Sequence, residues 1–594
     1  MSYRFSRRGV LGVVAAAVLP WATNAATAAT GSDAVFADLS KRWLDAMARF
    51  SPVSATQLGD HRFDGQIDDL SAKGRAATAA STRRFLAELD AMPKSALSRD
   101  NQMDAVILDN QLRYDLWTDE VLQSWAWDPL IYNEIAGDAL YALMAREFAP
   151  LTARLGLAVA RMEKLPEFLA QARRNLKPAR VPLIHAQTVA KQNAGLNSIV
   201  SELITPHAAE LPDGAQARLA AATAALAKAV AEHQTWIDTV LVPGAKGEFR
   251  LGDRLYDEKL AFALNSSLSR KQIRTRAEAA VIATRAEMYA LARGVLAGKT
   301  DGPVTPEAPT PAQQQAAIKA ALDLAAADHP AREDLVDAAK SGLAAATAFV
   351  KAKDLITLPD APVKVILMPK FQQGVSVAYC DSPGALDRNL TTFYAVSPIP
   401  DDWTAERTAS FLREYNRRAI DDIATHEAMP GHYVQLAHAN ACPSVLRAVL
   451  SNGPFVEGWA VYGESVMAQE GFLGGDPLYK LVVLKTKLRS ITNAILDQAI
   501  HVDGMSQAAA MTFMMETAFQ EEGEAASKWI RASVSSAQLP YYFVGSEEHW
   551  AARREAEKRW SGDFTLKRYH DTILSFGSPP VRLARAAMFG EAIG

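Results

Sequence analysis

The sequence predicts a mainly α-helical fold with one small β-sheet. Apolar residues recur at steps of three and four along much of the chain, as Phe36, Leu39 and Trp43 do near its start. Alanine-rich runs between about 213 and 353 add strong helix formers. Short segments rich in β-branched and aromatic residues, which indicate strands, come only after Leu358.

Length, composition and charge restrict the class of protein. The chain has 594 residues, of which 49% are hydrophobic and 22% charged, as in soluble globular proteins. The formal net charge of -4 comes without basic clusters, which argues against nucleic acid or an anionic membrane as partner. Cys380 and Cys442 could form one disulfide, but their spacing does not show whether they pair.

The first residues have the features of an export signal. Arg7 and Arg8 precede an apolar stretch at 9–19, and small residues at 26–28 form a cleavage site. The Ser-Arg-Arg-Gly-Val-Leu order is typical of the twin-arginine type. We therefore predict a signal peptide at 1–28 and a periplasmic or secreted product. No later apolar stretch is long enough to span a membrane, so we expect no membrane partner after cleavage.

Helices are predicted in series through the first part of the mature chain, which we assign to an N-terminal helical lobe at 29–355. The periodic and alanine-rich segments lie at about 33–50, 74–92, 100–123, 148–176, 184–204, 213–240, 268–297, 312–328 and 331–353.

A small sheet is predicted next, at the start of a second lobe of the same domain, 356–594. Its strands are expected at 363–368, 375–379 and 391–396, directly before a helical run that begins at about Thr404. An edge strand there could pair with an extended peptide, or the strands could simply brace the helix.

The segment His-Glu-Ala-Met-Pro-Gly-His at 426–432 contains the parts of a metal-hydrolase centre. Neutral imidazoles bind Zn²⁺ at about 2.0–2.1 Å, and a carboxylate beside them can deprotonate a metal-bound water. These roles would fall to His426 and His432 as ligands and to Glu427 as base. The alternative is an ordinary helix end with two incidental histidines.

The spacing of the two histidines requires a deformed helix. In a straight helix, residues six apart differ by about 9 Å of rise and roughly 240° of rotation, so they could not bind one ion. Pro430 lacks an N–H and clashes with the preceding turn, and Gly431 accepts unusual backbone angles. We therefore predict that this pair bends or bulges the helix and brings His432 back to the metal.

A catalytic zinc site needs a third protein ligand and an open position. Glu457 follows His432 by twenty-five residues, enough for the chain to return with a second helix. We predict Glu457 as third ligand, with Glu464 on the same helical face as an orienting or alternate ligand. Both glutamates could instead be solvated.

Two further residues are candidates for stabilising an oxyanion. His501 lies four residues after Asp497, which could orient its imidazole. Tyr542 lies in an aromatic turn, from which a phenol could donate a hydrogen bond. The structural alternatives are a capped helix and a packed aromatic corner.

Together these motifs resemble those of the bacterial domain-of-unknown-function 885 family, whose members are related to the gluzincin-type zinc metallopeptidases. The resemblance rests on the 426–432 segment with Gln435, the Glu457-Gly-Trp-Ala-Val-Tyr-Gly-Glu464 segment, Asp497 with His501, His570-Asp571 with Gly577, and Pro52, Thr56 and Gly59. It implies a large helical metallopeptidase-like fold with a deep cleft. It also implies His426, His432 and Glu457 as ligands of one Zn²⁺ ion.

We therefore expect an exported zinc-dependent peptidase that hydrolyses short peptides, with His501 or Tyr542 steadying the oxyanion. A metal-dependent hydrolase of another amide or ester, such as an acylated amino acid or a cell-wall fragment, also fits. So does a non-catalytic periplasmic binding protein. The partner expected is a peptide or small amide substrate, and the sequence leaves open endo- or exo-cleavage, the physiological metal and the oligomeric state.

Overall fold

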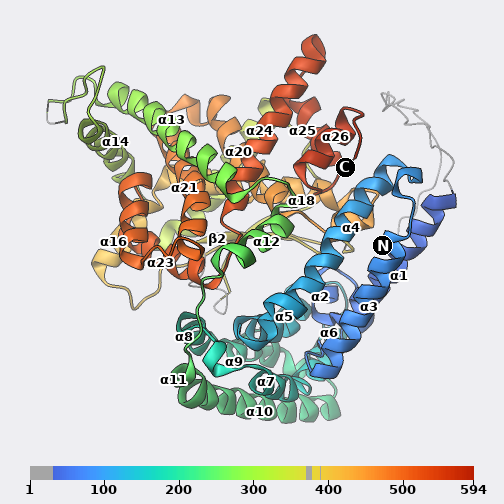
Figure 1. Cartoon of the computed structure of the whole chain (residues 1–594). Coiled ribbons are helices and arrows are strands. Elements are labelled where there is room, and N and C mark those ends of the chain that lie inside the picture. The colour runs from blue at the N-terminus through green and yellow to red at the C-terminus, as the bar shows by residue number, and fades with distance from the viewer. Residues whose placement is uncertain (1–30, 301, 370–376, 388–389, 594) are drawn as a thin grey trace, which may run out of the picture.

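The structure is a computed structural model that describes residues 31–300, 302–369, 377–387 and 390–593. The predicted signal peptide lies outside these ranges. Within them the predicted mainly helical fold with a small sheet is confirmed (Figure 1).

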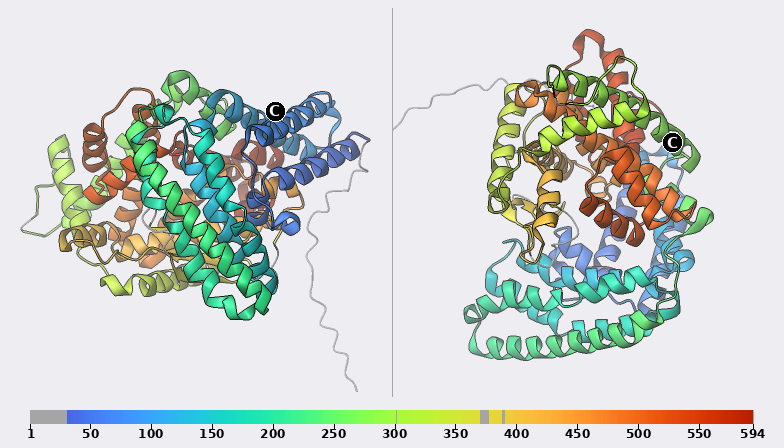
Figure 2. Two further views of the ribbon diagram at one scale, coloured as in Figure 1. Left: turned by 90° about the horizontal axis from the view of Figure 1, so that it is seen from below. Right: turned by 90° about the vertical axis from the view of Figure 1, so that its left-hand side faces the viewer.

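Helices α1 to α11 form the lower and right-hand part of Figure 1, and the right-hand view of Figure 2 shows α10 running along its base. Most of them lie in the segments predicted from apolar periodicity, but α2, α5 and α11 were not predicted, and the predicted segment 148–176 is two helices, α6 and α7. Their bounds are α1 (Gly31–Phe50), α2 (Pro52–Gln57), α3 (Ala72–Asp90), α4 (Arg99–Trp117), α5 (Leu130–Met144), α6 (Leu151–Met162), α7 (Leu165–Asn175), α8 (Leu183–Gln192), α9 (Gly195–Ile199), α10 (Asp213–Trp236) and α11 (Val242–Gly244).

The next four helices pack against the second half of the chain. They are α12 (Gly252–Leu264), α13 (Arg270–Leu296), α14 (Pro311–Ala326) and α15 (Leu335–Ala352). Met288 and Ala321 share a core with Leu488, and Tyr256 shares one with Ile491. The lobe division at residue 355 stays a prediction, while in the packing these four helices join the later ones.

The sheet contains three strands, β1 (Val363–Leu367), β2 (Ala378–Asp381) and β3 (Thr392–Val396), in the order β1-β3-β2. β1 is parallel to β3, and β2 is antiparallel to it. The strands lie close to the predicted segments, although the start of the predicted middle strand, 375–376, is outside the described residues. Cys380 on β2 and Cys442 are free thiols.

The remaining helices follow the sheet, and α20 among them is largely buried, with α17, α18, α21 and α24 packed against it. These later helices are α16 (Ala405–Glu414), α17 (Arg417–Glu427), α18 (His432–Asn440), α19 (Val445–Val449), α20 (Gly453–Gln469), α21 (Pro477–His501), α22 (Gln507–Thr512), α23 (Glu522–Val534), α24 (Pro540–Trp560), α25 (Leu566–Ser575) and α26 (Val581–Met588). The helical run predicted from Thr404 is therefore two helices, α16 and α17. Among the described residues no helix combines the length and apolar character that a membrane crossing requires.

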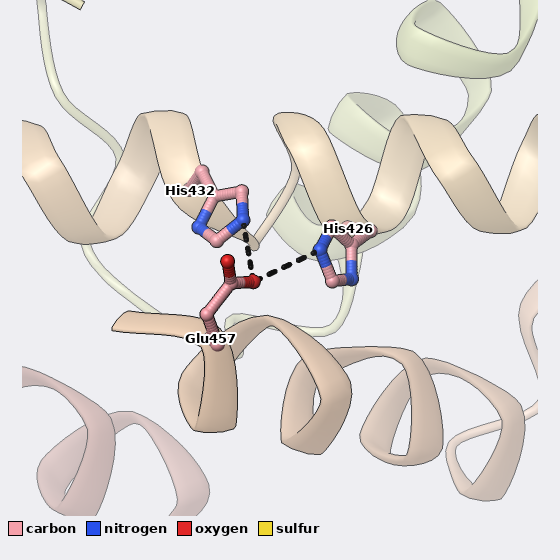
Figure 3. Close-up of side chains that lie close together, drawn as sticks. All are labelled: His426, His432 and Glu457. Carbon is pink, nitrogen blue, oxygen red and sulfur yellow. Dashed lines mark ion pairs between the residues drawn. The ribbon is translucent and has the colours of Figure 1, made fainter. Parts of the chain in front are cut away.

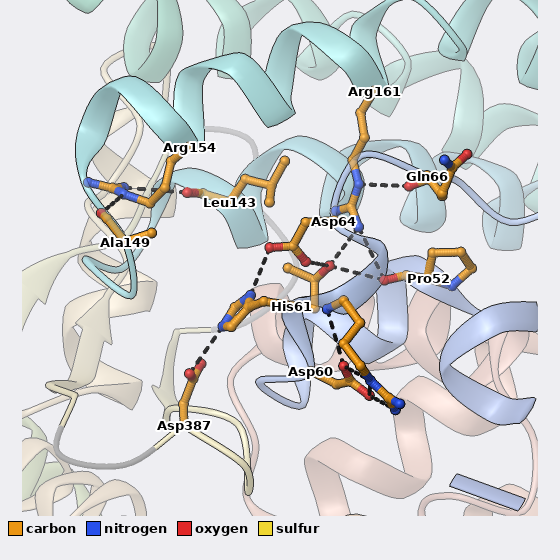
Figure 4. Close-up of polar contacts among 12 residues, drawn as sticks. Pro52, Asp60, His61, Asp64, Gln66, Leu143, Ala149, Arg154, Arg161 and Asp387 are labelled. Carbon is orange, nitrogen blue, oxygen red and sulfur yellow. Dashed lines mark hydrogen bonds and ion pairs between the residues drawn. The ribbon is translucent and has the colours of Figure 1, made fainter. Parts of the chain in front are cut away.

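Polar contacts attach the N-terminal helices to the loop after β2 (Figure 4). His61 lies between two carboxylates, with Nδ1 2.8 Å from Asp64 Oδ2 and Nε2 3.1 Å from Asp387 Oδ1. Burial lowers the pKa of His61, but its hydrogen bonds with Asp387 and Asp64 outweigh burial and raise the pKa to about 9. Nearby, the fully buried Arg161 donates to the carbonyl oxygen of Pro52 at 3.1 Å. The contacts of His61 and Arg161 therefore join segments that are far apart in the sequence.

Candidate metal centre

The helix that carries His426 ends three residues before Pro430 of the proline-glycine pair. α17 stops one residue after His426 and α18 starts at His432, so the chain forms two helices where one bent or bulged helix was predicted. A Cβ on Gly431 would lie 1.8 Å from the carbonyl oxygen of His426, so glycine is required there. Trp459 of α20 donates from Nε1 to the Pro430 carbonyl oxygen at 2.8 Å. The break is thus held against α20.

This break brings His426, His432 and Glu457 together (Figure 3). One ligand atom of each residue lies within 4.8 Å of the other two. Glu457 Oε2 is 3.7 Å from His426 Nε2 and 3.5 Å from His432 Nε2. The two imidazole rings lie 4.7 Å apart between centroids and are nearly perpendicular, at 88°. The end of α17, the start of α18 and α20 therefore each supply one ligand.

The two distances from Glu457 to the histidines fit a small tetrahedral cation. Ligand atoms about 2.0–2.1 Å from Zn²⁺ at tetrahedral angles are about 3.3–3.4 Å from one another. The observed 3.5 and 3.7 Å are only a few tenths of an ångström longer. The side chains of His426, His432 and Glu457 are 18%, 12% and 22% exposed, so this group of ligands is not sealed from solvent.

Glu464 takes the place of an orienting partner. Its Oε1 is 2.5 Å from His426 Nδ1, an arrangement that directs His426 Nε2 toward the other ligands. The Glu464 side chain is 1% exposed. Of the two glutamates, it is therefore Glu457 that the structure brings to both histidines.

A second buried acid, Asp422, lies close enough to Glu464 for their charges to interact, and it was not predicted. Burial raises the pKa of Asp422 well above its ordinary value, and the charge of Glu464 raises it further. Neither Asp422 Oδ1 nor Glu464 Oε2 has a hydrogen-bond partner among the described residues. Asp422 precedes His426 by four residues on α17, and this helical spacing was the signal that could have identified it.

The carboxylates around His426 stabilise positive charge at this place. Burial alone would lower the pKa of His426, but its hydrogen bonds with Glu457 and Glu464 raise it well above its ordinary value. In Glu457, burial alone would raise the pKa, but hydrogen bonds with His426 and His432 lower it below its ordinary value. Glu457 is therefore ionised, as a metal ligand must be.

Glu427 adjoins the ligands on the side of the β-sheet. It is the last residue of α17 and is half-buried. Its charge acts on His426 and Glu464. It acts also on Cys380 of β2, whose thiol pKa is raised mainly by burial. β2 is an edge strand packed against α17, so the predicted base lies on a helix that contacts this strand.

Tyr542 lies beside His426 because α20 and α24 cross closely. A Cβ on Gly458 would lie 2.2 Å from the carbonyl carbon of Gly545, so this crossing depends on glycine. The Tyr542 and His426 ring centroids are 6.5 Å apart. The Tyr542 hydroxyl accepts a hydrogen bond from Arg531 Nη2 at 2.8 Å. Burial raises the pKa of Tyr542, so the phenol keeps its proton to donate.

The structure does not bring His501 to the ligands. His501 and Asp497 are 1% and 0% exposed. His501 Nε2 donates to the Ala532 carbonyl oxygen at 2.8 Å, while Asp497 Oδ2 accepts from Tyr256 at 2.6 Å and from the Ala537 N–H at 2.8 Å. In the described part of the chain no hydrogen bond joins Asp497 to His501, so the predicted orienting pair is not formed.

Comparison with known proteins places the chain in a family. The model of DUF885, described as bacterial protein of unknown function, matches residues 52–588. The chain belongs to this family. A search of curated proteins finds no match.

Two solved structures resemble this DUF885 chain over nearly all of its length. A "putative lipoprotein of unknown function" from Shewanella oneidensis is 33% identical, with a TM-score of 0.77 over 93% of this chain and 99% of that one. A "putative lipoprotein" from Colwellia psychrerythraea is 16% identical, with a TM-score of 0.74 over 94% and 99%, and shows the same fold.

Other residues that carry the resemblance to the DUF885 family make structural contacts. Tyr462 donates to His570 Nε2 at 2.8 Å, and His570 Nδ1 donates to the Leu355 carbonyl oxygen at 2.7 Å. Burial lowers the pKa of His570 to about 3, so its ring is neutral. Gln435 Nε2 donates to Ser578 Oγ at 2.7 Å. These bonds attach the C-terminal segment to α18 and α20, which carry two of the ligands.

Proposed function

We propose that this DUF885 chain is an exported zinc-dependent peptidase that hydrolyses short peptides. The observation that carries the proposal is the convergence of His426 Nε2, His432 Nε2 and Glu457 Oε2 within 4.8 Å, with Glu427 beside them. Three protein ligands with an accessible fourth position are typical of catalytic zinc, whereas structural zinc has four protein ligands.

The residues around the ligands have distinct tasks in this proposal. Zinc held there would polarise the scissile carbonyl and lower the pKa of water. Glu427 accepts a proton from the attacking water and passes it to the leaving amine. Tyr542 donates its phenolic proton in a hydrogen bond to the carbonyl oxygen as negative charge develops there. We assign this last role to Tyr542 and not to His501, because only Tyr542 lies beside a ligand.

The edge strand β2 supports a peptide as substrate. Among the described strands β2 pairs only with β3, so its other edge offers main-chain N–H and C=O groups. An extended peptide can add to such an edge through main-chain hydrogen bonds. The packing of β2 against α17 would then place that peptide beside Glu427.

Export is part of the proposal. The apolar stretch after Arg7 and Arg8 has the pattern of a twin-arginine signal, a pathway that carries folded proteins. Two structural relatives carry the description "putative lipoprotein", a class of exported protein, which agrees with a location outside the cytoplasm.

A substrate panel with metal analysis tests this function. Protein purified without chelators and loaded with zinc should bind about one zinc per chain and hydrolyse di- to pentapeptides. Faster hydrolysis of N-acylated amino acids or cross-linked cell-wall fragments would favour the other amide or ester hydrolase. Zinc below about half an ion per chain, together with peptide binding but no turnover, would favour a binding protein.

A further inference from the structure

The guanidinium of Arg531, which contacts Tyr542, has no carboxylate within ion-pair distance among the described residues. Its Nη2 group donates to Tyr542 at 2.8 Å and to Gln538 Oε1 at 3.1 Å. Its Nε and Nη1 groups donate to no described residue, and neither atom is buried from solvent. Arg489, another arginine near these helices, is paired instead, with Nη2 2.6 Å from Glu524 Oε1. Arg531 thus presents a positive charge with free donors.

The position of Arg531 suits an anion close to the reacting bond. Arg531 Cζ is 5.8 Å from the centroid of the Tyr542 ring, which is 6.5 Å from the centroid of the His426 ring. Added together, these distances set an upper limit of about 12 Å between the guanidinium and His426. An extended peptide advances about 3.3–3.6 Å per residue, so at most about three residues fit between a carbonyl at the ligands and an anion at Arg531.

The protein itself supplies little charge to neutralise Arg531. Burial lowers its pKa, but the contacts with Tyr542 and the charge of Glu457 outweigh burial and raise it above its ordinary value. Glu457 is directed to the two histidines, however, and makes no ion pair with Arg531. A substrate anion would therefore meet an uncompensated, partly desolvated cation, where charge-assisted hydrogen bonds are strong.

We propose that Arg531 binds the free C-terminal carboxylate of the peptide, so that the chain is an exopeptidase that releases at most about three residues at a time from the C-terminus. The inference rests on the proposed peptidase function and specifies its substrate class. The terminal carboxylate is the one anion that every unblocked peptide carries, whatever its sequence. Arg531 is then a specificity-determining residue that fixes which bond lies at the ligands.

The wild-type enzyme provides the first test, which needs no variant. Alanine tri- and tetrapeptides with a free C-terminal carboxylate are compared with the same peptides as C-terminal amides. The free acids should have about 10- to 100-fold higher kcat/KM, the range expected for hydrogen bonds between charged groups. Equal rates on acids and amides would overturn the inference and leave the proposed peptidase function standing.

Variants separate recognition from a structural effect. Arg531→Gln should slow hydrolysis of the acid about 10- to 100-fold more than hydrolysis of the amide, and Arg531→Lys should keep part of the preference for the acid. Tyr542→Phe removes the hydroxyl that Arg531 contacts but keeps the guanidinium, so it should slow both substrates equally. Arg274→Gln, which removes an exposed arginine paired with Asp503, is the charge-matched control and should change neither rate. Equal slowing of acid and amide by Arg531→Gln would contradict the inference.

A binding experiment keeps the inference testable if no peptide is hydrolysed, an outcome that would remove the proposed function. Isothermal titration of zinc-loaded Glu427→Gln with trialanine and with trialanine amide should show at least about tenfold tighter binding of the acid. The difference should disappear in Glu427→Gln combined with Arg531→Gln. Equal affinity for acid and amide would exclude Arg531 as a carboxylate site.

Discussion

Two clusters of this chain contain the same types of residue and differ in what their atoms face. His426 with Glu464 and Tyr542 has side chains that reach an accessible point shared with two other ligands. His501 with Asp497 and Tyr256 is buried, and its hydrogen bonds end on backbone and on a tyrosine of the same cluster. A histidine beside an acid therefore indicates chemistry only where ligand atoms converge on accessible space.

The largest difference should come from replacing one carboxylate at each place, Glu427 beside the ligands and Asp497 in the buried cluster. Glu427→Gln should lower kcat for peptide hydrolysis about 1000-fold, because general base catalysis contributes about 10²- to 10⁴-fold. Its zinc content should stay unchanged, since Glu427 is not one of the three ligands. Asp497→Asn, the matched variant in the buried cluster, should keep kcat within about twofold. Kinetics with zinc analysis on both proteins checks this, and a comparable loss in Asp497→Asn would refute the distinction.

Removing a hydrogen-bond donor from each cluster should give the next largest difference. Tyr542→Phe should lower kcat about 100-fold, as expected when one oxyanion donor is lost. His501→Gln should leave kcat nearly unchanged but lower the thermal unfolding midpoint, because it disturbs a buried bond to the Ala532 carbonyl. Steady-state kinetics and thermal unfolding measure the two effects. If His501→Gln slowed turnover as strongly as Tyr542→Phe, the assignment of roles would be wrong.

Loss of the orienting carboxylate should weaken the metal site without abolishing it. Glu464→Gln should reduce zinc affinity about 10- to 100-fold, because a neutral amide holds the His426 imidazole less well than a carboxylate. Glu457→Gln, which replaces a ligand, should reduce the affinity further. Competition with a chelator of known affinity measures both. An unchanged affinity in Glu464→Gln would show that its 2.5 Å contact with His426 does not support the site.

The smallest effect is expected at His61, a charged histidine whose contacts with Asp64 and Asp387 are structural. The pKa of His61 is about 9 in the folded chain and about 6.5 unfolded, so its contribution to stability is present below about pH 6.5 and is lost as the pH rises through 9. His61→Gln should therefore be less stable than the wild type by about 1–3 kcal/mol at pH 6 and by much less at pH 9.5. Denaturant unfolding at both pH values measures the difference, with His207→Gln as control. A difference that stays constant with pH would contradict this contribution.

Much of the fold could be predicted because most helices have one apolar face. Apolar residues at steps of three and four predicted a helix at 33–50, which is α1 (Gly31–Phe50). The helix α5 (Leu130–Met144) was missed, because apolar residues occur on several of its sides and leave no polar stripe to reveal a helical period. The end of α17 at the Pro-Gly pair was predicted only as a bend, since sequence does not show how α20 holds the break through Trp459.

The site residues that are close together in the sequence could be predicted. The residues that are brought to the site by the packing of distant helices could not. His426, Glu427 and His432 are close in sequence, and a ligand twenty-five residues later could be inferred from what zinc requires. Arg531 could not be predicted, because only the fold brings Arg531 on α23 to Tyr542 on α24, which packs against α20. His501 was assigned a role in catalysis because spacing shows which residues share a helical face, but not whether that face is buried.

The central claim is that three side chains from α17, α18 and α20 hold one metal ion, and crystals soaked with zinc test it most directly. Anomalous diffraction at the zinc edge should locate a single ion about 2.0–2.1 Å from His426 Nε2, His432 Nε2 and a Glu457 oxygen. No anomalous peak at saturating zinc, or an ion bound away from these three atoms, would contradict the account.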